Sequence, residues 1–215
     1  MLNKLREPVN GLSHLFAAIA AVIGLIIMLV IKTEGTLKGI SLLIYGLSLI
    51  VMFSASAAYH LINSGEKVTF YLRKLDHSAI FLLIAGTYTP ICLHFFSGFW
   101  QYGLLIIVWS IALSGVLLKL FVKSTHRWIS TGLYLIMGWL SVAAIKEITS
   151  TMSIEALIWF FSGGFFFTAG AVIYALKKPN FNPGVFGFHE LWHIFVILGC
   201  FCHYVVIAAF VAPAG

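Results

Sequence analysis

Long apolar runs separated by short polar segments dominate the chain. A helix needs about 20 apolar residues to cross about 30 Å of hydrocarbon. Seven runs come close to this length, and each predicts a membrane-spanning helix: Val9–Ile31, Ile40–Ile62, Leu75–Phe96, Tyr102–Leu118, Ile129–Ile145, Ala156–Leu176 and Phe188–Val211. Because the connections are short, successive helices should alternate in direction and pack together. The pattern predicts an all-α membrane protein, a seven-transmembrane helix bundle forming one domain over residues 1–215.

Composition agrees with this class. The chain is 61% hydrophobic and 9% charged, whereas a soluble domain carries about 25% charged residues. Its mean hydropathy is +1.03. The chain therefore lacks the polar surface that a water-soluble globule needs, and lipid should serve as its solvent.

The first apolar run has a competing interpretation as a cleaved signal peptide. MLNKLR would be its basic start, and Ala18-Ile19-Ala20 would be its cleavage site. The apolar run continues past these residues to Ile31 without a break. This length favours a retained span.

Basic residues predict the orientation, because cytoplasmic loops of membrane proteins collect Lys and Arg. One side of the predicted bundle carries most of the 13 basic residues: Lys4, Arg6, Lys67, Arg73, Lys74, Lys119, Lys123, Arg127, Lys177 and Lys178. The other side carries the remainder: Lys32, Lys38 and Lys146. The N-terminus should therefore be cytoplasmic and the C-terminus outside. The net charge of +6 then reflects topology and attraction to anionic headgroups, without a nucleic acid.

Polar residues gather at one depth of the predicted bundle. His60 ends the second predicted helix, and Asp76 lies in the first turn of the third. The starts of the first and seventh helices contribute the rest: Asn10, Ser13, His14, His189, Glu190 and His193. Four helices thus bring ionisable groups to a level just under the predicted cytoplasmic surface. Intramembrane ionisable residues indicate function by default.

The stretch HELWH, residues 189–193, fits the zinc-protease pattern H-E-x-x-H. His189 and His193 are four residues apart and share one helix face. With His60 as a third nitrogen, the set suits Zn²⁺ with a fourth position left for water, and Asp76 could accept a hydrogen bond from that water. The alternative is a group of interfacial residues that hydrogen-bond to each other and to water near the headgroups.

Other polar and small residues receive structural interpretations. His203 lies ten residues after His193, about 15 Å along the helix, and should make a hydrogen bond inside the bundle. His14 is a candidate fourth ligand, although a helix-packing hydrogen bond is favoured. Pro90, within Gly86–Pro90, should break or kink the third helix. Small residues should let the sixth helix approach a neighbour closely: Ser162, Gly163, Gly164 and Gly170. The three cysteines read as apolar filler: Cys92, Cys200 and Cys202.

Several of these elements together resemble the hemolysin III family, the bacterial branch of the progestin and adipoQ receptor family. Ser56-Ala-Ala-Tyr-His60 is similar to its S-x3-H element, and Leu75–Ile80 to its third-helix acidic motif. Three further stretches fit in order along the whole chain: Glu7…Asn10…Ser13-His14, Ala85–Pro90, and His189-x3-His193 followed by His203.

The resemblance implies a seven-helix bundle with a cytoplasmic N-terminus in the bacterial cytoplasmic membrane. It implies zinc on His60, His189 and His193, with Asp76 bonded to the zinc water and Ser56 in a supporting role. Related receptors tolerate other residues between the two histidines, which argues against Glu190 as a protease-type base.

Three functions follow as hypotheses. The first is a zinc-dependent hydrolase of a lipid amide or ester that adjusts membrane composition, with a membrane lipid as substrate or ligand. The second is a pore-forming cytolysin, which is disfavoured because the sequence holds no amphipathic segment suited to line a large channel. The third is a non-catalytic membrane sensor with structural zinc, in which four protein ligands would close the site.

Overall fold

The fold was taken from a computed structural model that describes residues 5–122, 127–182 and 186–214. Five of its spans are single helices: α1 (Pro8–Ile31), α2 (Thr36–Leu61), α3 (Glu66–Phe95), α4 (Gly98–Phe121) and α7 (Ile154–Leu176). The fifth span is divided into α5 (Arg127–Trp139), η2 (Leu140–Ala144) and α6 (Ile145–Thr151). The last joins α8 (Phe188–Val206) to a π-helical turn, η3 (Ile207–Val211). These seven spans confirm the predicted all-α bundle of a multi-pass membrane protein.

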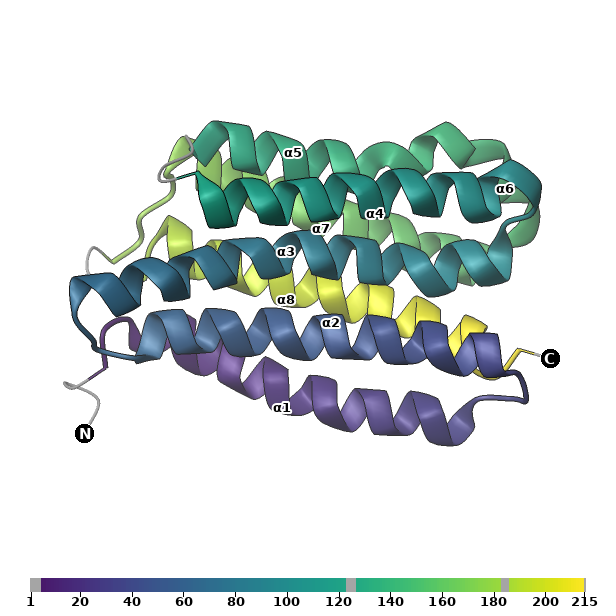
Figure 1. Ribbon diagram of the computed structural model, residues 1–215, viewed down its shortest axis with the longest axis horizontal. Helices are drawn as coiled ribbons and strands as arrows, with labels where there is room; N and C mark the ends of the chain where they lie inside the picture. The colour runs from purple at the N-terminus through teal and green to yellow at the C-terminus, as the bar shows by residue number, and fades with distance from the viewer. Residues whose placement is uncertain (1–4, 123–126, 183–185, 215) are drawn as a thin grey trace.

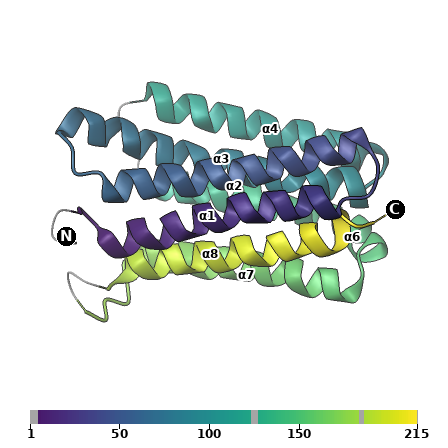
Figure 2. The same cartoon turned by 90° about the horizontal axis from the view of Figure 1, so that it is seen from below.

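The spans lie side by side along the long axis of the molecule (Figure 1). Neighbouring helices in sequence pack together from α1 to α4, and α8 packs against both α7 and α1. Figure 2 shows α1 lying along α8, which closes the bundle between its first and last spans. The two chain ends lie at opposite ends of the bundle. We call the end that holds the start of α1 the N-terminal end; its assignment to the cytoplasm stays a prediction.

Apolar side chains cover the outside of the bundle as well as its core. Met28, Tyr45 and Phe81 are fully buried between helices. Phe16 and Val30 are 68% and 76% exposed although both are large and apolar. Such an exterior would be unfavourable in water, and it is what a lipid-facing surface requires.

The third span starts earlier than its hydropathy predicts. The structure begins α3 at Glu66, so the expected start at Leu75 is wrong. Asp76 therefore lies ten residues into α3, about 15 Å from its beginning, and not in its first turn. Residues 66–74 hold no Gly or Pro and can continue a helix, but their charges hide this extension from a hydropathy pattern.

The chain does not break at Pro90, because α3 is continuous through this residue, and the predicted kink there stays a prediction. Thr87 and Thr89 donate hydrogen bonds to the carbonyls of Leu83 and Ala85, at 2.8 and 2.9 Å. Hydroxyl groups of this kind supply hydrogen bonds to backbone carbonyls near a proline within a membrane helix.

An interruption that the sequence did not reveal lies in the fifth span, where η2 separates α5 from α6. The Tyr88 hydroxyl of α3 accepts a hydrogen bond from the Ser141 backbone N–H at 2.8 Å. The same hydroxyl lies 2.9 Å from the Gly138 carbonyl, to which it donates. A side chain of a neighbouring helix thus satisfies backbone groups at the interruption.

Close packing of α7 against α8 confirms the role predicted for two glycines. A Cβ atom on Gly163 would lie 2.4 Å from the His203 ring, and one on Gly170 would lie 2.8 Å from Phe195. Gly164 is less crowded, since its nearest neighbour, Trp139, would be 4.0 Å away. Only a residue without a side chain allows α7 and α8 to approach this closely at Gly163 and Gly170.

Candidate metal centre

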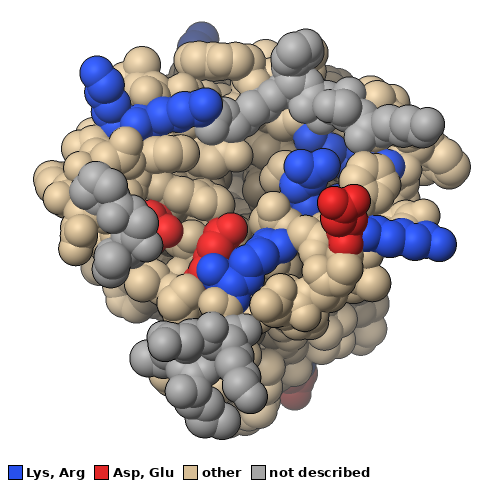
Figure 3. All heavy atoms as spheres, turned by 90° about the vertical axis from the view of Figure 1, so that its left-hand side faces the viewer, with Lys and Arg blue, Asp and Glu red and all other residues tan. Residues whose placement is uncertain are grey.

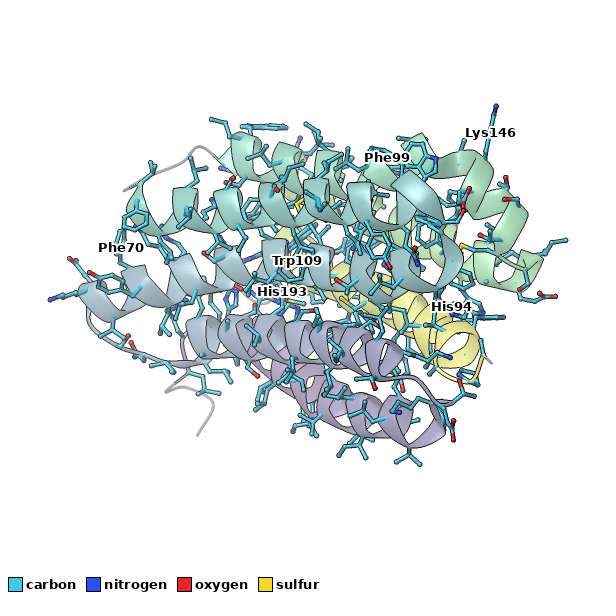
Figure 4. The ribbon with its side chains drawn as sticks, turned by 45° about the vertical axis from the view of Figure 1, so that its right-hand side comes forward. Phe70, His94, Phe99, Trp109, Lys146 and His193 are labelled. Carbon is cyan, nitrogen blue, oxygen red and sulfur yellow. The ribbon has the colours of Figure 1, made fainter. Side chains whose placement is uncertain are left out.

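Three histidines from two helices meet inside the N-terminal end of the bundle. His60 lies in the last turn of α2, and His189 and His193 occupy successive turns at the start of α8. One nitrogen from each ring lies within 4.8 Å of the other two. His60 and His193 are buried, and His189 is partly exposed. In Figure 4 His193 lies within the bundle, whereas Lys146 and Phe99 project from its outside.

A carboxylate orients the first of these rings. Glu7, just before α1, places Oε2 at 2.6 Å from Nδ1 of His60. The Glu7 backbone N–H also donates to the His60 carbonyl at 3.0 Å. The hydrogen bond with His60 lowers the pKa of Glu7 to about 2, against the opposing effect of burial. With Nδ1 engaged, Nε2 is the His60 nitrogen that remains for a cation, an arrangement typical of histidine ligands.

The sequence pattern did not assign Glu7 a role of its own. It appeared only as the first residue of a stretch that resembles the hemolysin III family. Its partner His60 is 53 positions away, so no local spacing links the two. Histidine ligands commonly bond a carboxylate through their second nitrogen. A search for an acidic residue at the same predicted level as His60 would therefore have found Glu7.

Both carboxylate oxygens of Glu190 make structural hydrogen bonds. Its Oε2 accepts a hydrogen bond from the Gly187 N–H at 2.8 Å, which caps the start of α8. Its Oε1 accepts from the Asn10 side chain at 2.9 Å. The Asn10 amide also lies 3.3 Å from Glu7 Oε2, so it joins the two acidic residues across α1 and α8. Glu190 thus holds α8 against α1, which agrees with the expectation that HELWH is not a protease motif here.

Asp76 enters from α3 and is tied to the other helices through Ser56. Ser56 lies one turn before His60 on α2, and its hydroxyl hydrogen-bonds with the Asp76 carboxylate. Both side chains are buried. Asp76 also interacts electrostatically with His60. The structure therefore brings the predicted acid, its supporting serine and the histidines to one level.

His14 and His203 differ in their relation to the centre. The His14 ring lies on the His193 ring with 4.0 Å between centroids. The His14 ring also lies near the His193 backbone, although neither of its nitrogens makes a hydrogen bond of good geometry among the described residues, so the packing hydrogen bond stays a prediction. His203 lies farther along α8, where its Nε2 is 3.2 Å from the Phe160 carbonyl. That contact confirms the predicted hydrogen bond inside the bundle.

A cavity of about 470 Å³ adjoins the histidines. Its walls come mainly from α3, α5, α7 and α8, with a few residues from α1, α2 and α4, and Asp76, His189 and His193 line it. From His189 to His203 the lining extends 14 residues along α8, about 21 Å. Much of the interior is apolar: Ile80, Leu83, Ile91, Phe167 and Val196. The volume falls within the range of about 300–1,000 Å³ typical of ligand pockets.

The donor set fits a zinc ion. Neutral imidazoles suit Zn²⁺, and three of them leave one position of a tetrahedral site open. At Zn–N distances of about 2.0–2.1 Å, tetrahedral geometry separates the nitrogens by about 3.3 Å. A small inward movement of the rings would meet this separation. Nδ1 of His193 is buried and makes no hydrogen bond of good geometry among the described residues.

Comparison with known proteins identifies the family. The pattern described as "Haemolysin-III related" matches residues 2–204. The "Hemolysin-3 homolog" of Bacillus subtilis (strain 168) is 33% identical over 195 residues, which cover 90% of this chain and 88% of that protein. "Hemolysin-3" of Bacillus cereus is 33% identical over 209 residues, covering 96% and 92%. "Heptahelical transmembrane protein 4" of Arabidopsis thaliana is 28% identical over 172 residues, covering 70% and 43%.

The chain therefore belongs to the haemolysin-III-related family of membrane proteins. The family resemblance predicted from Ser56–His60, Leu75–Ile80 and the histidine motif is confirmed.

Proposed function

We propose that this protein is a zinc-dependent hydrolase that cleaves a lipid amide or ester within the membrane. One observation carries the proposal: three histidines able to hold a cation and a buried carboxylate lie beside an apolar cavity at the end of a membrane-spanning bundle. Apolar walls suit an acyl chain, while a cation site and a carboxylate suit hydrolysis.

Each residue has a defined part in this proposal. His60, His189 and His193 hold the zinc, and Glu7 keeps the His60 ring in the required orientation. A zinc ion in such a site lowers the pKa of water towards about 7. Asp76 accepts a proton from the attacking water, and Ser56 positions the Asp76 carboxylate through their hydrogen bond.

A non-catalytic role with structural zinc is the alternative that the site itself raises. The His14 ring lies against the His193 ring, with 4.0 Å between their centroids. As a fourth ligand it would close the coordination sphere, and closed sites are structural. Loss of zinc in a His14→Phe variant would support the alternative, because Phe preserves a ring at this position but offers no ligand.

The direct test measures lipid cleavage by the purified protein in liposomes. We expect free fatty acid to be released from a lipid amide or ester by the zinc-loaded protein. Release should stop after chelation and resume when zinc is restored. Many lipases need no zinc, so release by a contaminating lipase should continue after zinc is removed. Equal release before and after chelation would reject the proposal.

A further inference from the structure

Basic side chains surround the cavity where it meets the N-terminal end of the bundle. Arg73 and Lys74 of α3 and Lys119 of α4 line this part of the cavity. Among the described residues that line it, Asp76 is the single carboxylate. Figure 3 looks onto this end and shows Lys and Arg side chains beside a hollow in the surface. We call Arg73, Lys74 and Lys119 the cation cluster.

Contacts with neighbouring residues hold the two α3 cations at the cavity. The Nζ atom of Lys74 donates to the Leu120 carbonyl at 2.6 Å and lies 4.7 Å from the centre of the Phe70 ring. The Arg73 guanidinium lies 5.9 Å from the same ring. Phe70 itself lines the cavity and lies at this end of the molecule in Figure 4. Both positive charges are thus oriented before any ligand binds.

Lys119 is the most unusual member because it is only 6% exposed. Lysine is rarely buried, and here its amine donates a hydrogen bond to the Ser130 hydroxyl of α5. Lys119 also lies close enough to Arg73 for the two to repel one another. Two positive charges held close together near a low-dielectric wall attract an anion more strongly than either charge alone. An anion at the cavity would offset this repulsion.

We propose that the cation cluster binds the anionic headgroup of a lipid, a phosphate or a carboxylate, whose acyl chain occupies the cavity. An arginine guanidinium binds both groups through paired hydrogen bonds. Arg73 precedes Asp76 by three residues on α3, about 4.5 Å along the helix axis. The carbonyl groups just below a headgroup on Arg73 therefore reach the level of Asp76 and the histidines.

This proposal names the charge of the substrate and to that extent rests on the proposed function. The binding itself does not require turnover. Its competitor is the general attraction of basic loops to anionic membranes, which all Lys and Arg residues at this end share. Lys67 separates the two explanations. It is exposed on α3 and does not line the cavity.

The experiment measures lipid retention by native mass spectrometry on the purified, zinc-loaded full chain in neutral detergent. One arm offers equimolar phosphatidylglycerol and phosphatidylcholine with identical acyl chains, and the other offers oleate and oleyl alcohol. We expect one anionic lipid per chain, retained about tenfold over its neutral counterpart, since hydrogen bonds to charged groups are stronger than those to neutral groups. Retention of phosphatidylglycerol identifies a phosphate headgroup, and retention of oleate alone identifies a carboxylate.

The variants locate the headgroup. Arg73→Gln and Lys119→Met should each lower retention of the anionic lipid about tenfold, whereas Lys67→Gln should change it less than about twofold. Zinc content reports whether each variant keeps its fold, and Arg73 is exposed enough to be replaced without disturbing the core. Equal retention of neutral lipids, or an equal loss in Lys67→Gln, overturns the proposal. Selective binding without lipid cleavage would instead contradict only the proposed hydrolase.

Discussion

Glu7 and His60 form a 2.6 Å contact between Oε2 and Nδ1 across 53 positions of the chain. The contact joins the segment before α1 to the last turn of α2. It therefore makes Glu7, just before α1, part of the candidate metal centre. The backbone N–H of Glu7, bonded to the His60 carbonyl at 3.0 Å, fixes the same two residues a second time.

Replacing Glu7 tests this arrangement. Glu7→Gln should weaken zinc binding by about 10–100-fold, the range typical for partners of histidine ligands. Competition with a chelator of known affinity measures the change. Glu190→Gln is the matched control, because Glu190 bonds to Asn10 and Gly187 and to none of the three histidines in the contacts described above. An equal effect of both changes would mean that Glu7 acts through helix packing.

Zinc content tests the ligand set. The purified protein should hold about one zinc per chain, and His60→Ala, His189→Ala and His193→Ala should each remove most of it because three ligands are needed. Elemental analysis of the purified variants gives the zinc content. His203→Ala should retain the metal, since its ring contacts the Phe160 carbonyl. Zinc lost from His203→Ala but kept by His193→Ala would show that the ligand set is wrong.

Variants of two carboxylates, Asp76 and Glu190, identify the catalytic base. Asp76→Asn should lower lipid cleavage by about 10²–10⁴-fold, the usual contribution of a general base, while most of the zinc remains bound. Glu190→Gln should be mild, because an amide oxygen can still accept the Gly187 N–H that caps α8. Initial rates of fatty acid release and zinc content are measured on both variants. An inactive Glu190→Gln beside an active Asp76→Asn would reverse the assignment.

Packing of α7 on α8 predicts a difference between two glycines. Gly163→Ala should destabilise the protein by about 1–3 kcal/mol, the usual cost of overpacking, because its Cβ would lie 2.4 Å from the His203 ring. Gly132→Ala, in α5, meets nothing within 4 Å and should stabilise by about 0.5–1 kcal/mol. Thermal unfolding in detergent compares them. A stable Gly163→Ala would show that the helices can separate there at little cost.

Orientation in the membrane follows from the basic residues and needs its own test. A reporter fused after Gly215 should lie outside, and one inserted between Lys123 and Arg127 should lie in the cytoplasm. Activity of a phosphatase reporter and fluorescence of a cytoplasmic reporter distinguish the two sides. Both reporters on one side would contradict the three spans between them, and exchanged sides would invert the predicted topology.

The sequence alone determined the spans and the level of the candidate site. A bilayer admits only long apolar helices, so hydropathy revealed all seven and placed His60, His189 and His193 at one end. The four-residue spacing of His189 and His193 fixed their common face before any tertiary contact was known. Hydropathy failed at Glu66–Lys74, because this part of α3 is helical but charged.

Only the tertiary structure decided how the helices turn towards one another. That rotation depends on contacts between distant residues, such as Gly163 against His203 and Tyr88 at the interruption of the fifth span. The same contacts paired Glu7 with His60 and laid His14 on His193. The hydropathy of the sequence indicates which segments can enter lipid, whereas side-chain packing between helices determines which residues contact one another.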